Sequence, residues 1–526
     1  MSLPTVEDWV RSEDRRGFLL AATSFAFTPL LGKTANGLVR HSPRFANDPF
    51  VLGVGSGDPA ADGFVLWTRL ASDPVNGGGM PPENFEVRWE VAHDEQMKKI
   101  VRSGMTVATP HLGHSVHVEV DGLQPDRWYF YRFQSGDALS PVGRTRTTPK
   151  MDAMPDQLRF AFASCQHFET GYYNAYRHMN EDDLDLVIHL GDYIYEGGVS
   201  TKADRVRRHN GPEINTLNDY RNRYGLYKSD PDLQAAHARW PWLVTWDDHE
   251  FDNNYSNDIS EEQHIDAAEF LVRRAHAYQA YYEHMPLRKS SVPKGPSMQL
   301  YRSVRYGTLA EFDVLDTRQF RTDQPCGDRR KKPCDGIFAE QATLLGNTQE
   351  EWLQKTLQES PTTWNVLAQQ VMMARVDRDP SDGVAWGVDQ WSGYDLARKR
   401  LLAFLAESKI LNPVVLTGDI HSNWVNDLKV DFDQENDNVV ATEFVGTSIS
   451  SGGNGSKTRS DTAGVLRDNS FVRFFNNERG YVRCTVTPEL WQSDYRVVDT
   501  VTSRDSNCLT RASYAVEAGH AGAERV

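Results

Sequence analysis

Short apolar runs separated by turn residues dominate the chain between residues 50 and 147. The runs are rich in β-branched and aromatic residues, and they cover residues 64–70, 87–91, 116–120 and 128–133. This pattern predicts the short strands of an antiparallel sandwich. We therefore expect a β-sandwich domain over residues 46–150, with no catalytic constellation of its own, followed by a linker at residues 151–156.

Beyond residue 158 the pattern changes to apolar β runs that alternate with helical stretches. Each of these β runs is followed at once by a polar cluster. The runs cover residues 158–163, 184–190, 242–246 and 413–417. Alternating strands and helices predict an α/β layered domain whose site lies where the strands end. We expect this larger domain to cover residues 155–515.

Acidic and histidine side chains follow these strands. Singly, an Asp after a strand is usually a turn residue or a helix cap, and a lone His is usually a satisfied hydrogen-bonding group. Together they would meet at one rim, where crowded carboxylates repel one another by several kcal/mol at low effective dielectric. Multivalent cations would resolve that repulsion. The candidate residues are Asp192, Asp247, Asp248, His249, Asp419 and His421.

Length and charge narrow the class of protein. A chain of 526 residues predicts two or more domains, and 39% hydrophobic with 25% charged residues is a globular composition. The formal net charge of -16 argues against a nucleic-acid-binding surface, which needs clustered Lys and Arg. An acidic protein that acts on phosphate needs local cations, and bound metals can supply them.

The N-terminus is similar to a twin-arginine export signal. Arg15 and Arg16 precede Gly17-Phe18-Leu19, and a modest apolar run follows at residues 21–31. The alternative is a short amphipathic helix. The run is too short to span a bilayer, and no later segment reaches the roughly 18 apolar residues required. We expect a signal peptide over residues 1–45, passage through the twin-arginine translocation machinery, and a secreted, periplasmic or cell-wall-associated protein without a stable membrane span.

Five cysteines leave at least one without a partner. The short loop between Cys326 and Cys334 predicts a local disulfide. Cys484 and Cys508 can pair or remain buried as free thiols. Cys165 directly follows a predicted strand, and it is therefore a free thiol or a ligand.

Four strand-end motifs together resemble the calcineurin-like metallophosphoesterases and, more closely, the alkaline phosphatase D (PhoD-like) family. They are Phe162-Ala163-Ser164-Cys165-Gln166 and residues 191–196, 245–250 and 416–421. The resemblance extends over nearly the whole chain, including residues 316–319, 369–370 and 444–448. The turn at residues 121–125 resembles a fibronectin-type corner braced by a tyrosine. The family implies a fibronectin-like N-terminal sandwich and a larger four-layer α/β/β/α metallophosphoesterase domain.

The resemblance also implies the ligands. Cys165 stands where many relatives have a ligating Asp, and as a thiolate it would bind Fe3+ together with Asp192, Tyr195 and His421. Asp192 would bridge to Ca2+. Asp248 and Asp419, at positions where relatives have Asn and His, would complete that site, and Asp247 would serve the same or a second calcium. Carboxylates favour calcium over zinc, so these departures are chemically coherent.

The expected activity is hydrolysis of phosphate mono- or diesters by an exported monomer. Paired cations would neutralise phosphoryl oxygens and supply hydroxide from water for in-line attack. The resemblance suggests that His249 contacts phosphate or protonates the leaving oxygen, and Arg318 could steer the anionic substrate. The alternative for His249 is a structural histidine bonded to a backbone carbonyl. The alternative for the activity is a phospholipase D-type phosphodiesterase reaction.

Three other classes stay open. Cys, Tyr, Asp and His could hold iron in an exported protein without hydrolysis, although such a site has no use for Asp248 and Asp419. The chain could be a binding module that has lost activity. A Ser-His-Asp hydrolase would need a Gly-x-Ser-x-Gly elbow, which the Ser- and Gly-rich segment at residues 446–455 lacks. We interpret that segment as a loop near the site.

Overall fold

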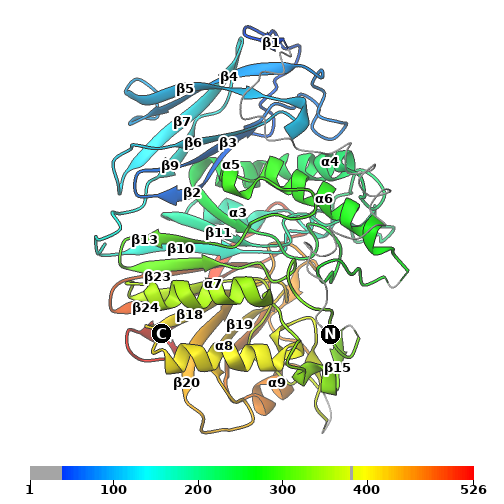
Figure 1. Ribbon diagram of the computed structural model, residues 1–526, viewed down its shortest axis with the longest axis vertical. Helices are drawn as coiled ribbons and strands as arrows, with labels where there is room; N and C mark the ends of the chain where they lie inside the picture. The colour runs from blue at the N-terminus through cyan, green and yellow to red at the C-terminus, as the bar shows by residue number, and fades with distance from the viewer. Residues whose placement is uncertain (1–37, 263, 328, 380–382) are drawn as a thin grey trace, which may run out of the picture.

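The computed structural model describes residues 38–526 except residues 263, 328 and 380–382. Strands near the N-terminus lie at one end of the long axis, and the helices α7 (Gly346–Glu359) and α8 (Asp395–Glu407) lie toward the other end (Figure 1). The twin-arginine motif at Arg15 and Arg16 lies outside the described residues. Among those residues no helix combines the length and the apolar character needed to cross a bilayer.

The N-terminal region is a β-sandwich, as predicted. One sheet contains β1 (Val39–Arg40), β4 (Asn84–Ala92), β5 (Ile100–Ala108), β7 (Trp128–Ser135), β8 (Ala138–Leu139) and β9 (Gly143–Arg146). It packs against β2 (Val54–Ala60), β3 (Gly63–Arg69) and β6 (Ser115–Val120) through a shared apolar core. The Gln124 amide donates a hydrogen bond of 3.0 Å to Tyr129 Oη, which is the tyrosine-braced corner expected from the sequence.

The second sheet of the sandwich continues into the larger domain. β2 pairs in parallel with β12 (Pro241–Thr245), through Ser56 opposite Pro241 and Gly57 opposite Trp242. A Cβ on Gly57 would lie 2.6 Å from the Trp242 carbonyl oxygen, so only glycine permits this approach. The two regions therefore share one ten-stranded sheet.

That sheet runs in the order β26-β25-β24-β23-β10-β11-β12-β2-β3-β6. Its remaining strands are β10 (Leu158–Ala163), β11 (Leu186–Leu190), β23 (Gly480–Val486), β24 (Leu490–Val498), β25 (Cys508–Glu517) and β26 (Glu524–Arg525). A second sheet runs in the order β13-β14-β16-β18-β20-β19-β22-β21. Its strands are β13 (Arg302–Tyr306), β14 (Ala310–Val314), β16 (Trp364–Ala368), β18 (Pro413–Thr417), β19 (Asn423–Lys429), β20 (Val439–Val445), β21 (Gly455–Ser456) and β22 (Val472–Glu478).

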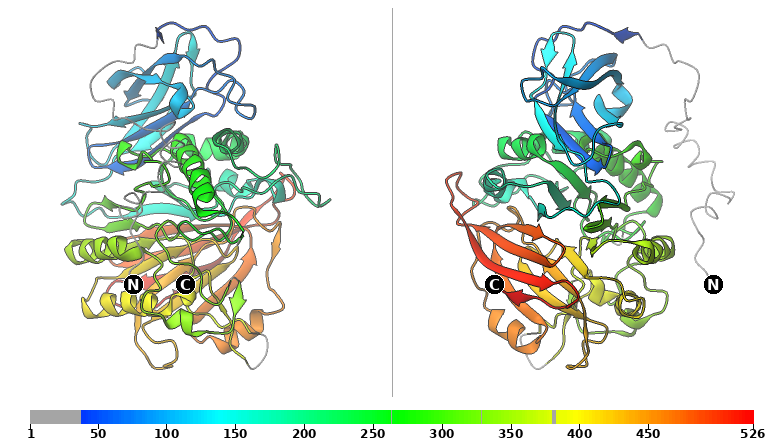
Figure 2. Two further views of the ribbon diagram at one scale, coloured as in Figure 1. Left: turned by 45° about the vertical axis from the view of Figure 1, so that its right-hand side comes forward. Right: turned by 90° about the vertical axis from the view of Figure 1, so that its left-hand side faces the viewer.

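Alternating side chains along the strands explain the layers. In β10, Phe160 and Phe162 enter a core that both sheets share, whereas Ala161 and Ala163 enter a core shared with helices. Because each sheet buries one face against the other sheet and one face against helices, the larger domain has four layers, α/β/β/α, as predicted (Figure 2).

Helices cover the outer faces of both sheets. α3 (Asn174–Met179), α4 (Leu217–Lys228), α5 (Pro231–Arg239) and α6 (Ala267–His284) lie on the ten-stranded sheet, and α7 (Gly346–Glu359), α8 (Asp395–Glu407) and α9 (Thr462–Asp468) lie on the other. Local sequence sets where several of them begin. Thr216 and Asp219 form a capping box on α4, and Asp230 caps α5 directly before Pro231.

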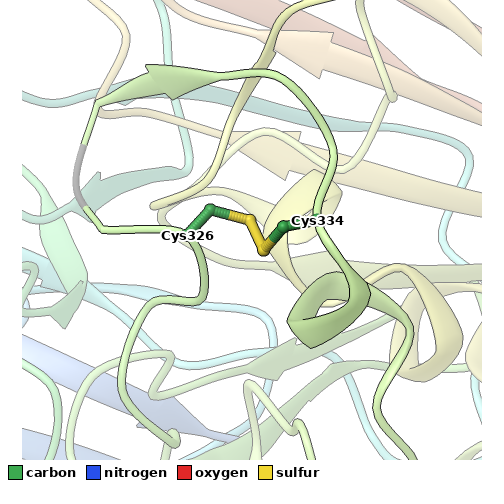
Figure 3. Close-up of a disulfide and its surroundings, with 2 residues drawn as sticks. All are labelled: Cys326 and Cys334. Atoms are coloured by element: carbon green, nitrogen blue, oxygen red, sulfur yellow. A yellow bond between two sulfur atoms is a disulfide. The ribbon is translucent and has the colours of Figure 1, made fainter.

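The predicted disulfide is present. Cys326 and Cys334 are bonded, with their Cα atoms 5.9 Å apart (Figure 3). Cys165, Cys484 and Cys508 are free thiols, so the pairing of Cys484 with Cys508 that the sequence left open does not occur. The bridged loop carries β15 (Arg330–Lys331), which pairs with β17 (Trp386–Gly387).

Candidate metal centre

Four residues that follow the strand ends have left-handed backbone. The φ angles are 59° at Cys165, 58° at Asp192, 59° at Asp419 and 53° at His421. This region is costly for residues with a Cβ, and such residues cluster at functional sites, where surrounding structure holds them in place. All four are candidates from the sequence, and each comes within four residues of the end of β10, β11 or β18.

Cys165, Asp192 and His421 offer ligand atoms that all lie within 4.8 Å of one another. Tyr195 completes this group, because its Oη lies 2.8 Å from Asp192 Oδ2 and 3.3 Å from His421 Nε2. The structure thus brings together all four residues that the resemblance assigns to iron. A thiolate, a phenolate, a carboxylate and an imidazole form a donor set that suits a ferric ion.

The other acidic candidates form an adjoining group. Asp247, Asp248 and Asp419 offer oxygens within 4.8 Å of one another, and so do Asp192 and Asp248 with a nitrogen of His249. Asp192 Oδ1, Asp247 Oδ2 and Asp248 Oδ1 are buried without a hydrogen-bond partner among the described residues. Buried carboxylate oxygens without donors are costly unless a cation binds them. The residues therefore fit hard cations such as calcium.

The pKa shifts of the carboxyl groups indicate that the protein alone supplies too little positive charge at this site. Burial raises the pKa of Asp192 well above its usual range, and Asp248 and Asp247 raise it further against the opposing effect of His249. Burial raises the pKa of Asp419 to about 7, with Asp389 and Asp248 adding to the shift. Asp248 differs, because Arg318 and His249 outweigh its burial and lower its pKa. A bound cation would allow all of these groups to ionise together.

The Cys165 thiol and the Tyr195 phenol also need a nearby cation in order to ionise. Burial, followed by the charge of Asp192, raises the pKa of both the Cys165 thiol and the Tyr195 phenol. Both groups would stay protonated without a metal, so metal binding would release their protons. Burial lowers the pKa of His421 to about 3, with Arg479 as the next cause, which keeps its imidazole neutral as ligation requires.

His249 lies at the mouth of the site, with 21% of its side chain exposed. Its Nδ1 lies 2.7 Å from Glu196 Oε2, and its ring contacts the Tyr195 ring at a tilt of 32°, with centroids 4.1 Å apart. Burial lowers the pKa of His249, but Glu196 and Asp192 outweigh it and raise the pKa well above the usual range. Glu196 thus fixes the ring and favours its protonated form, as a proton donor requires.

The Arg318 side chain is fully buried, whereas a residue that steers substrate would be accessible from solvent. Nε donates to Asp247 Oδ1 at 2.5 Å, Nη1 and Nη2 donate to Asp389, and Nη2 lies 3.5 Å from Asp248 Oδ1. With its donors directed at carboxylates, Arg318 positions Asp247 and Asp248. These contacts favour a positioning role for Arg318 over the predicted role in steering substrate.

Several residues that support the site could not be singled out from the sequence. Glu250 accepts hydrogen bonds from the backbone amides of Asp192 and Asp247, at 2.9 and 2.8 Å, and so joins two strand ends. It is the last residue of the strand-end motif at residues 245–250, where the sequence alone does not indicate its role. Asp389 follows the two-residue strand β17, which is too short for any periodic pattern.

The Ser- and Gly-rich segment is a loop near the site, as interpreted from the sequence. Ser451 Oγ lies 2.7 Å from both Tyr195 Oη and the Cys165 carbonyl oxygen, and it accepts a hydrogen bond from the His167 amide at 3.0 Å. Ser451 has no histidine side chain as its hydrogen-bond partner among the described residues. Its contacts give it a role in positioning ligands rather than in nucleophilic attack.

Comparisons with known proteins agree with this architecture. The profile of the PhoD-like phosphatase family matches residues 160–495, and that of the PhoD-like phosphatase N-terminal domain matches residues 35–149. Alkaline phosphatase D of Bacillus subtilis (strain 168) is 52% identical over 521 residues, which are 98% of this chain and 89% of that protein. The solved structure of PhoD superposes with a TM-score of 0.90 at 53% identity, and the match covers 92% of this chain and 93% of that one. The chain belongs to the PhoD-like phosphatase family.

Proposed function

We propose that this chain is an exported phosphoester hydrolase whose centre holds Fe3+ and Ca2+. Membership of the phosphatase family establishes a phosphatase or phosphodiesterase, and the proposal adds the metals and the compartment. The observation that supports it is the set of three buried carboxylate oxygens, on Asp192, Asp247 and Asp248, that have no hydrogen-bond partner in the described part of the chain. These oxygens adjoin the thiol, phenol and imidazole of the iron group.

The donor types support one metal for each group. Cys165, Tyr195 and His421, with Asp192, would hold Fe3+, because thiolate and phenolate stabilise the ferric state. Asp248 and Asp419, with Asp192 as a bridge, would hold Ca2+, and Asp247 would serve the same or a second calcium. The cations would neutralise the phosphoryl oxygens and provide hydroxide from water at alkaline pH.

The chain's own residues supply position and protons. His249, held by Glu196, would place its free ring nitrogen toward the leaving oxygen and protonate it, a contribution typically worth about 10²–10⁴-fold. Arg318 holds Asp247 through Nε and lies 3.5 Å from Asp248, where its charge favours the ionised form of Asp248. Glu250 fixes the spacing of the strand ends that carry Asp192 and Asp247.

Export completes the proposal. The Cys326–Cys334 disulfide suits an oxidising compartment, and the Arg15-Arg16 motif suits the twin-arginine translocation machinery, which carries folded proteins. These features support the proposal of a secreted or cell-wall-associated protein that acts on phosphate mono- or diesters. Fractionation of expressing cells tests it: Arg15→Lys and Arg16→Lys together should keep the protein in the cytoplasm, and unchanged export would contradict the signal.

The activity itself is tested with 4-nitrophenyl phosphate and bis(4-nitrophenyl) phosphate at alkaline pH. We expect release of nitrophenol that EGTA abolishes and calcium restores, from protein that contains iron. Asp419→Asn should need more calcium for half-maximal activity, whereas Asp156→Asn on the surface should behave as the wild type. Full activity after exhaustive chelation would contradict the calcium assignment, and active protein without iron would contradict the ferric one.

A further inference from the structure

A polar cavity of about 440 Å³ lies beside the candidate metal centre. Arg205, Arg479, Asp204 and Thr502 line it together with the glycine-rich residues 452–456. None of the candidate metal ligands lines this cavity, and neither does His249.

The cavity and the metal centre share a wall. Arg479 lines the cavity, and its Nη1 donates to the carbonyl oxygen of the candidate ligand His421 at 2.6 Å. Gly452 lines it as well and directly follows Ser451, whose hydroxyl contacts Tyr195 at 2.7 Å. A substrate bound at the metals would therefore have the cavity next to it.

Two guanidinium groups in the cavity wall retain free donors. Arg479 is 4% exposed, and its Nε and Nη1 donate to backbone oxygens, but Nη2 has no hydrogen bond with the described residues. A Cβ on Gly452 would lie 2.9 Å from that Nη2, which places the free donor at the cavity wall. Within the described residues, the Arg205 side chain donates only to Asp204, at 3.1 Å. The cavity lining thus includes two guanidinium groups and one carboxylate, Asp204, whose side chain is 73% exposed.

The glycine-rich segment keeps the cavity open. Gly452, Gly453 and Gly455 have φ angles of 81°, 71° and 68°, which side chains rarely permit. A Cβ on Gly453 would meet nothing within 4 Å, so the space beside the backbone is empty of protein atoms.

We infer that this cavity binds a second anionic group of the substrate, a phosphate or carboxylate beyond the ester held at the metals. Guanidinium groups with free donors match the oxygens of such groups, and hydrogen bonds to charged partners are the stronger kind. The inference rests on the proposed function and adds a substrate class to it: phosphodiesters that carry a further negative charge.

A matched pair of substrates tests the subsite. Thymidine 5'-(4-nitrophenyl phosphate) and its 3'-phosphorylated form release the same nitrophenol and differ only in the second phosphate. We expect kcat/KM about 10-fold higher for the 3'-phosphorylated form, mainly through KM, as one additional charge-assisted contact gives. Equal kcat/KM values would overturn the inference.

Charge variants identify the residue responsible. Arg205→Gln should reduce the preference for the phosphorylated substrate to near one. Arg208→Gln removes the same charge from the same loop. In the part of the chain that the structure describes, Arg208 bonds only to backbone oxygens of Arg207 and Lys202 and does not line the cavity, so this variant should keep the preference. The same loss in both variants would overturn the assignment to this cavity.

The experiments distinguish a failure of the proposed hydrolase function from a failure of the subsite inference. If neither diester were hydrolysed, the hydrolase proposal would fail, and calorimetric binding of thymidine 3',5'-bisphosphate would then decide the subsite. Affinity about 10-fold weaker in Arg205→Gln than in Arg208→Gln would support it. Equal affinities would overturn it.

Discussion

Asp389 accepts hydrogen bonds from both terminal nitrogens of Arg318, at 2.9 and 3.0 Å, while Nε of the same guanidinium donates to Asp247. One buried cation therefore joins the segment after β17 to the end of β12. Arg318 and the proposed calcium would neutralise the same group of carboxylates. Protein stability and metal binding should depend on each other at this point.

Arg318→Met should destabilise the protein by about 3–5 kcal/mol in EGTA, because it leaves Asp247 buried without its cation and leaves Asp389 with Arg321 as its remaining guanidinium partner. The loss should be smaller with saturating calcium, which restores positive charge beside Asp247. Urea denaturation in both conditions measures it. Arg400→Met, which breaks only a surface pair with Glu350, should cost no more than about 1 kcal/mol in either condition. An equal loss with and without calcium would contradict the coupling.

The Cys326–Cys334 disulfide should affect calcium binding at a distance. Gln324, two residues before the bridge, donates to Asp389 Oδ1 at 2.7 Å, and the bridged loop pairs with β17. Replacing both cysteines with serine should loosen Asp389 and raise the calcium concentration for half-maximal activity by about 3- to 10-fold. Reduction of the wild type with a phosphine should reproduce the change.

The free thiol Cys508 provides the control for that experiment. Cys508→Ser should bind calcium as the wild type does and should respond to the phosphine in the same way. A double serine variant with unchanged calcium dependence would show that the bridge serves stability alone, where a loop of this size contributes about 2–3 kcal/mol.

Local pattern was sufficient for the strands that carry the site. β10 and β18 have the predicted bounds, because buried strands of five or six apolar residues are bounded by polar ones. β11 begins two residues later than predicted, at Leu186. Leu184 is apolar because it packs under helices, but it lies in the preceding loop. Burial in a loop and burial in a strand produce the same pattern.

Contacts between residues that are far apart in sequence produce no such local pattern. The pairing of β2 with β12 joins residues about 185 positions apart, and nothing near Ser56 indicates it. Arg318 could be recognised as part of a motif, but the carboxylates that enclose it, Asp247 and Asp389, are distant in sequence, so its burial and hence its role could not be predicted. Residues that act through other side chains are visible only in three dimensions.

The Asp313 carboxyl should contribute a loss of stability as pH rises from about 4 to 8. Burial raises the pKa of this carboxyl to about 8, so the folded state holds a proton that the unfolded state loses near pH 4. The cost is absent below pH 4 and complete above pH 8. Asp313→Asn should therefore gain on the order of 3–5 kcal/mol relative to the wild type between pH 4 and pH 9.

Denaturation at several pH values measures this difference, and subtraction of the wild-type profile removes the contributions of other groups. Asp156→Asn, on the exposed linker, should give a flat difference profile. A flat profile for Asp313→Asn as well would show that the Asp313 carboxyl is not protonated in the folded protein.

Tyr195 offers a spectroscopic test of the iron group. Its Oη lies 2.8 Å from Asp192 and 3.3 Å from His421, so a ferric ion among them would bind the phenolate and colour the protein by charge transfer. Tyr195→Phe should shift or abolish the visible band, and Cys165→Ala should remove iron, while the circular dichroism stays unchanged in both. Tyr224→Phe is the matched control, because its buried Oη has no hydrogen-bond partner among the described residues and lies outside the donor set. If the visible band and the iron content were the same in Tyr195→Phe as in Tyr224→Phe, the phenol would not be a ligand, and its contacts with Ser451 and Asp192 would serve only to hold the loop against the centre.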